Sequence, residues 1–113
     1  MAKIQMKPTT FGFLVEQWIK EHVDNPTKVR PATSRSYRAA LKNLRPVFDH
    51  VDVENVSRKH IRMYYDLRKS FSHTNAQREI EVIRLFLNWC VDMEYIEFNP
   101  ANKLKFARPA PRE

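Results

Sequence analysis

The stretch that decides the fold is HTNAQREIEVIRLFLNWCVDM, residues 73–93, because apolar side chains recur in it every three or four residues. That spacing places them on one side of an α-helix. In the later half of the stretch they extend to nearly every side, which is typical of a helix that neighbours cover from several directions. We therefore expect a central helix over residues 73–93 with two apolar stripes: Ala76, Ile80, Ile83, Leu87 and Cys90, and Val82, Leu85, Phe86 and Trp89.

The first helix is expected over about residues 10–23, on apolar positions with the same spacing: Phe11, Leu14, Val15, Trp18 and Ile19. Thr9 or Thr10 can cap it, because a hydroxyl there accepts a hydrogen bond from a free N–H group of the first turn. Asp24-Asn25-Pro26 stops it, since proline disfavours helical geometry in the residue before it.

The second helix is expected to begin at Pro31-Ala32-Thr33, with Thr33 or Ser34 as its cap. Its apolar stripe comprises Tyr37, Ala40, Leu41, Leu44 and later Phe48. Proline lacks the N–H donor and clashes with the preceding turn, so we expect Pro46 to end or kink this helix.

A third helix is expected over residues 57–69, capped by Ser57 and built on Ile61, Tyr64, Tyr65 and Leu67. Alternating valines in residues 49–56 have no evident partner strand, so we interpret that stretch as an extended loop that tucks its valines inward. The chain has one glycine and seven prolines, which does not suit the tight turns of β-hairpins. These patterns predict an all-α fold, a compact four-helix bundle.

The length of 113 residues suits a single domain with one core. We expect a flexible leader over residues 1–9, the domain over residues 10–101 and a basic linker over residues 102–113. No apolar run approaches the roughly 20 residues that span a membrane, and no signal-peptide pattern opens the chain. A cytoplasmic protein is therefore expected.

The basic side chains are segregated along the chain, whose net charge is +7. Residues 28–45 contain six of them and no acid, and residues 58–69 contain five and a single acid. Residues 79–97 instead carry five acids and only Arg84 as a basic residue. This segregation indicates an anionic partner, with double-stranded DNA first and a membrane surface second. A membrane-binding face is disfavoured because the core uses the apolar residues.

No cluster typical of catalysis is present in the sequence. The four histidines are scattered, and there is neither a paired-carboxylate motif nor a glycine-rich phosphate loop. Cys90 is the only cysteine, so an intramolecular disulfide and a cysteine-based zinc cluster are excluded. We expect no cofactor, no metal and no enzymatic activity from this chain alone.

Candidate DNA contacts lie at the starts of the second and fourth helices. A helix fits the major groove of duplex DNA, and the free N–H groups at a helix start favour phosphate. The candidates are the basic, hydroxyl and amide side chains at these two starts, together with cations of the linker before the second helix and of the C-terminal stretch. They are Lys28, Arg30, Thr33, Ser34, Arg35, Arg38, Lys42, His73, Thr74, Asn75, Gln77, Arg78, Lys103 and Lys105.

Four segments resemble, in their order and spacing, the core-binding (SAM-like, N-terminal) domain of phage integrases, the tyrosine recombinase family. They are TFGFLVEQWIKEH, RPATSRSYRAALKNLRPVF, VENVSRKHIRMYY and NAQREIEVIRLFLNWCVDMEYIEFNPANKLK. Residues at the family's positions include Thr33, Tyr37, Leu44, Phe86, Trp89, Ile96, Asn99 and Pro100. The chain departs from the pattern at Pro46 and at His50, where such proteins often have glycine.

The resemblance implies a SAM-like orthogonal bundle that grips the core recombination site for DNA integration or excision by a prophage-type recombinase. The family's catalytic residues would belong to a catalytic domain that is absent from this chain. The implied partners are double-stranded DNA, that catalytic domain and neighbouring recombinase subunits, and Lys103 and Lys105 would follow the DNA backbone. The alternative is a small basic helical module that binds an acidic protein.

Overall fold

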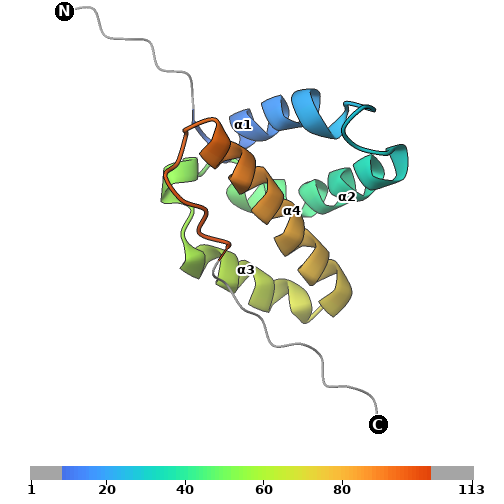
Figure 1. The fold of residues 1–113 in the computed structure, drawn as a ribbon. Helices are drawn as coiled ribbons and strands as arrows, with labels where there is room; N and C mark the ends of the chain where they lie inside the picture. The colour runs from blue at the N-terminus through green and yellow to red at the C-terminus, as the bar shows by residue number, and fades with distance from the viewer. Residues whose placement is uncertain (1–8, 103–113) are drawn as a thin grey trace, which may run out of the picture.

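The computed structural model describes residues 9–102, which form an all-α bundle of four helices (Figure 1). The helices are α1 (Phe11–Trp18), α2 (Pro31–Phe48), α3 (Arg58–Lys69) and α4 (His73–Asp92). Two short elements accompany them, a π-helical turn η1 (Ile19–Val23) that continues α1, and a 3₁₀ turn η2 (Val53–Asn55). The helical fold expected from the sequence is thus confirmed.

Side-chain hydroxyls cap α1, α3 and α4, as expected at Thr10 and Ser57. The Thr10 hydroxyl accepts a hydrogen bond from the Phe13 N–H at 3.4 Å, and the Ser72 hydroxyl accepts one from the Asn75 N–H at 3.2 Å. At α3 the capping is reciprocal: Ser57 accepts from the backbone of His60, whose Nδ1 accepts from the Ser57 N–H at 3.3 Å. Each cap satisfies an N–H group that has no partner within its helix.

Helix α2 begins where expected, but its cap differs from the expectation, and Pro46 does not end it. The helix begins at Pro31 with Arg30 as its N-cap, so Thr33 and Ser34 lie inside the first turn and do not cap it. Proline suits this first position because its fixed φ is helical and its missing N–H would have no helical partner there. The helix also continues through Pro46 to Phe48. Pro46 removes one helical hydrogen bond near the end of α2, and the buried Phe48 ring anchors the last turn.

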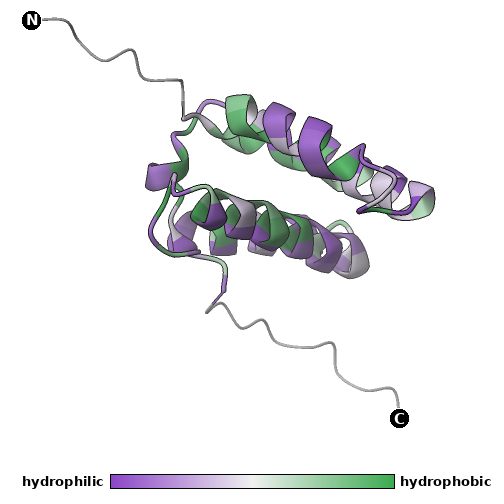
Figure 2. Cartoon of the chain, turned by 45° about the horizontal axis from the view of Figure 1, so that its top comes forward, coloured by the Kyte–Doolittle hydropathy of each residue, from purple (hydrophilic) through white to green (hydrophobic). Residues whose placement is uncertain are grey.

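The core surrounds α4, as expected. Phe86 of α4 lies 4.8 Å from the Phe11 ring and 5.6 Å from the Trp18 ring, and Phe11 also stacks on Phe48 at 5.3 Å. Figure 2 shows the helices in two pairs, with α1 and α2 in one pair and α3 and α4 in the other. Large side chains from both pairs therefore fill the space between them.

The loop between α2 and α3 buries Val53 and Val56, as expected, although its middle forms the 3₁₀ turn η2. Backbone hydrogen bonds join it to the start of α1: the Phe11 N–H donates to the Val51 carbonyl at 2.7 Å, and the Val53 N–H donates to the Thr9 carbonyl at 2.9 Å. These bonds hold the loop against the start of α1.

Two leucines assigned to apolar faces lie on the surface. Leu67 is 59% exposed, because α3 turns Tyr64 and Arg68 toward the interior instead. Leu85 is 41% exposed, so the later half of α4 is not covered on every side. Within residues 9–102, no helix has the length and apolar character needed to cross a membrane.

The chain after α4 is held against that helix by Asn99, which is buried. Its side-chain amide donates to the Arg84 carbonyl at 2.9 Å and to the Asn88 side chain at 2.8 Å. The Asn99 side-chain oxygen accepts from the Ala101 N–H at 2.8 Å. These bonds give the Asn99-Pro100-Ala101 stretch a defined position on α4.

Candidate nucleic-acid interface

Three of the four cations of α2 lie on its exposed side, and the fourth, Arg45, is half-buried and paired with Glu16 and Asp49. Arg35, Arg38 and Lys42 are spaced by three and four residues, which places them on one face of the helix. Arg38 forms an ion pair with Asp24, at the end of η1, and both side chains are about half exposed. Arg35 and Lys42 form no ion pair with any of the described residues, so their charges are available to a partner.

The first turns of α4 carry the second group of candidates. Thr74, Asn75 and Arg78 are exposed, and Gln77 is half-buried. His73 is also half-buried, and its Nε2 lies 3.0 Å from the Tyr65 hydroxyl of α3. His73 therefore has a structural contact, whereas the exposed side chains of this turn face solvent.

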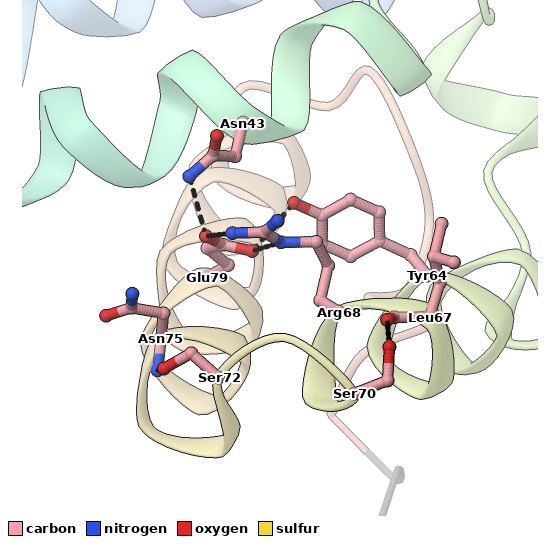
Figure 3. Close-up of polar contacts among 8 residues, drawn as sticks. All are labelled: Asn43, Tyr64, Leu67, Arg68, Ser70, Ser72, Asn75 and Glu79. Atoms are coloured by element: carbon pink, nitrogen blue, oxygen red, sulfur yellow. Dashed lines mark hydrogen bonds and ion pairs between the residues drawn. The ribbon is translucent and has the colours of Figure 1, made fainter.

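A buried carboxylate joins these two regions (Figure 3). Glu79 of α4 is only 2% exposed. Its Oε1 accepts from the Tyr64 hydroxyl at 2.7 Å and from Arg68 Nε at 2.9 Å. Its Oε2 accepts from Arg68 Nη2 at 3.0 Å and from the Asn43 amide at 2.9 Å. One side chain thus links α2, α3 and α4.

The charges of this cluster are matched. Burial by itself would raise the pKa of Glu79, but hydrogen bonds from Arg68, Tyr64 and Asn43 outweigh burial and hold the pKa below its ordinary value. Burial, followed by the hydrogen bond to Glu79, raises the pKa of Tyr64. Glu79 is therefore ionised and Tyr64 neutral at physiological pH, so the Arg68 guanidinium faces a full negative charge.

The cluster fixes how two candidate regions sit relative to each other. Asn43 follows Lys42 directly in α2, and Glu79 follows Arg78 directly in α4. The hydrogen bond between Asn43 and Glu79 therefore holds the backbones that carry Lys42 and Arg78 at a set separation. Lys42 and Arg78 are both exposed on the two helices that this bond joins.

The remaining candidates lie farther along the chain or outside the described part. Lys28 and Arg30 are exposed in the connection between η1 and α2. Thr33 and Ser34 are half-buried in the first turn of α2. Lys103 and Lys105 lie outside the described residues.

The Glu79 cluster, with Arg68 as its cation, was not predicted from the sequence. A signal was available, because Glu79 lies between Ala76 and Ile80 on the apolar face of α4. A carboxylate on a buried face needs a cation or several donors. Tyr64 and Arg68, one turn apart on the neighbouring helix, supply both.

No group of three or more histidine, cysteine or acidic side chains that could hold a metal ion occurs within residues 9–102. Comparisons with known protein families, with curated proteins and with solved structures find no match. The features of the described residues that bear on function are the exposed cations of α2 and α4 and the buried cluster that joins these helices.

Proposed function

We propose that this chain is a DNA-binding module of a site-specific tyrosine recombinase, in which it grips the core recombination site during DNA integration or excision. The observation that supports the proposal best is the exposed basic face of α2, where Arg35, Arg38 and Lys42 recur every three or four residues and only Arg38 is paired with an acid among the described residues. A catalytic domain in the same protein would supply the chemistry, and the protein would act in the cytoplasm.

The physical case for DNA depends on spacing and charge. Phosphates recur along both strands of a duplex, so cations held by two rigid helices can contact the backbone at several points. Each neutralised phosphate lowers the slope of log affinity against log salt by about 0.9. Contacts from Arg35, Lys42 and Arg78 together predict a slope contribution of roughly −2.7.

The experiment is an amide NMR titration of the chain with a short duplex at about 50 and 200 mM salt. We expect shifts at residues 33–42 and 73–78 that weaken at the higher salt concentration. A folded spectrum in which those residues do not respond at low salt would contradict the assignment.

Two variants of equal charge make the test specific to the surface. Arg35→Gln/Lys42→Gln/Arg78→Gln removes three positive charges from the proposed face, and Arg58→Gln/Lys59→Gln/Arg62→Gln removes three from the exposed side of α3. The first set should weaken DNA binding far more than the second. Equal losses would mean that net charge alone attracts the DNA.

A second candidate function is supported by an apolar stripe on the outer side of α3. Met63 and Leu67 are each 59% exposed, and Phe71, one turn farther on, is 73% exposed. With Lys59 and Arg62 nearby, this surface suits an acidic protein partner that also has apolar side chains. A lack of response to duplex DNA would favour this function, a basic helical protein-interaction module.

A further inference from the structure

A groove of about 910 Å³ lies away from the proposed DNA face, between η2 with the start of α3 and the segment that follows α4. Figure 1 shows that segment running beside η2. The apolar part of the groove lining comprises Val53, Val56, Val91, Ile96, Phe98 and Pro100. The groove thus presents an apolar surface on a strongly basic chain.

The charged residues of this groove are mainly acidic. Glu54, Glu94 and Glu97 line it and are exposed, against the single cation Arg58. The chain as a whole carries a net charge of +7. The groove therefore repels a phosphate backbone and attracts a segment that is both basic and apolar.

The backbone of Glu94 is in an unfavourable conformation. Its φ is 66°, in the left-handed region that favours glycine. It occupies the position just after the end of α4, where the Glu94 and Tyr95 N–H groups donate to the Val91 and Cys90 carbonyls at 2.9 Å. Glycine is the usual residue at this position. A glutamate here keeps a carboxylate at the groove despite the conformational cost.

Phe98 gives a third indication of a partner. It lines the groove, yet its side chain is 70% exposed. Large apolar side chains at a concave surface are typical anchors of protein contacts. The strained Glu94, the exposed Phe98 and the further carboxylates of Glu54 and Glu97 all belong to this one surface.

We propose that this groove binds residues 103–108 of a second copy of this chain. Their sequence, KLKFAR, places Leu104 and Phe106 between basic residues. In an extended segment, Leu104 and Phe106 project to one side and the two lysines to the other. The apolar pair fits the lining of the groove, and the cations match its carboxylates.

The position of the groove suits a mutual exchange. Pro100 lines it, and Lys103 follows Pro100 by only three residues in the sequence. A two-fold axis near that edge brings the segment of each copy to the groove of the other. Such an exchange closes into a dimer and leaves no groove free. The inference does not rest on the proposed DNA binding, because the test contains no DNA.

The test is a charge exchange between copies, followed by sedimentation velocity at low salt. The groove variant is Glu94→Lys/Glu97→Lys, and the segment variant is Lys103→Glu/Lys105→Glu. The wild-type chain should approach twice the monomer mass as its concentration rises. Each variant alone should remain monomeric, because its groove and segment carry like charges. An equimolar mixture should form the dimer again, since each groove then meets an oppositely charged segment.

Three results would overturn the proposal: a wild-type chain that stays monomeric, variants that dimerise as well as the wild type, or a mixture that remains monomeric. The last result would also be expected if the segment bound its own groove. Circular dichroism serves as the folding control, and Glu94 and Glu97 are exposed, so their substitution leaves the core intact. Recovery in the mixture cannot come from misfolded variants.

Discussion

The Asn43 amide of α2 donates a 2.9 Å hydrogen bond to the carboxylate of Glu79 in α4. Asn43 is exposed and Glu79 is buried, so the bond runs from the surface into the interior. The other partners of Glu79, Tyr64 and Arg68, come from α3. The Glu79 side chain thus links three helices, and each of its two oxygens accepts two hydrogen bonds.

Glu79→Gln should destabilise the fold by about 2–3 kcal/mol. Arg68 loses its charged partner, and the NH₂ group that replaces one carboxylate oxygen cannot accept the hydrogen bonds made to that oxygen. Asn43→Ala is the milder comparison, since it removes a single bond at the surface, and we expect a loss of about 1 kcal/mol. Urea denaturation monitored by circular dichroism measures both. An Asn43→Ala loss as large as that of Glu79→Gln would show that the surface bond dominates.

The pKa of Glu79 is lowered in the folded state, so its contribution to stability is present above the unfolded value of about 4.5 and is lost as the pH falls through the folded value. The difference in unfolding free energy between wild type and Glu79→Gln should therefore be constant near neutral pH. It should narrow below about pH 4.5. Urea titrations over a series of pH values test this, and a difference that does not change in acid would mean that Glu79 is not the responsible group.

Gly12, the only glycine, allows α1 to pack closely on the end of α2. A Cβ atom at this position would lie 2.9 Å from the Asp49 Cγ, and Arg45 holds that carboxylate in place at 3.1 Å. We expect Gly12→Ala to lower the free energy of unfolding by about 1–3 kcal/mol, because neither the α1 backbone nor the Asp49 carboxylate can move freely. Thermal unfolding measures the loss. Adding Asp49→Ala to Gly12→Ala should recover part of the lost stability, because the clashing carboxylate is then absent. If the stability losses of the two substitutions simply add in the double variant, the clash is not the cause.

Asp24 offsets the charge of Arg38 in the proposed DNA face. Asp24→Asn should therefore strengthen DNA binding, by up to about fivefold at low salt, since exposed ion pairs are worth up to about 1 kcal/mol. Fluorescence anisotropy with a labelled duplex measures the change. In the Asp24→Asn background, Arg38→Gln should remove the gain. A gain that survives this second substitution would point to a general charge effect.

Glu94→Gly should stabilise the chain by about 1 kcal/mol, because glycine adopts a positive φ without the cost that other residues have. Glu94→Ala is the matched control, since it also removes the carboxylate but keeps the unfavourable backbone. Thermal unfolding should separate the two variants, while both weaken the proposed dimer. Equal stability of the two would show that the backbone conformation at residue 94 carries no cost.

Apolar periodicity was enough to predict the helical fold. The stripes of α1 and α4, and the caps at Thr10, Ser57 and Ser72, depend on contacts within a few residues, which a sequence displays directly. The cap of α2 was misjudged because proline at the first position competes with hydroxyl residues as a start signal. The choice between them depends on which conformation Arg30 adopts.

The polar cluster could not be predicted from local patterns. Whether Arg68 faces solvent or Glu79 depends on how α3 packs against α4, since the two residues come from different helices. The same holds for Arg38, whose partner Asp24 lies in another element. Sequence patterns identified the exposed cations of α2 and α4, but only the packed structure shows which of them carboxylates already neutralise.

Cys90 lies fully buried in the packed face of α4, and burial raises the pKa of its thiol to about 12. In the folded state the thiol is neither accessible to a thiol reagent nor deprotonated to the reactive thiolate. Labelling of Cys90 therefore requires the helices around it to separate. Since the chain has no other cysteine, the labelling rate reports the opening of the core itself. The protein thus carries its own single-site probe, with which the opening free energies of the variants described above can be compared under native conditions.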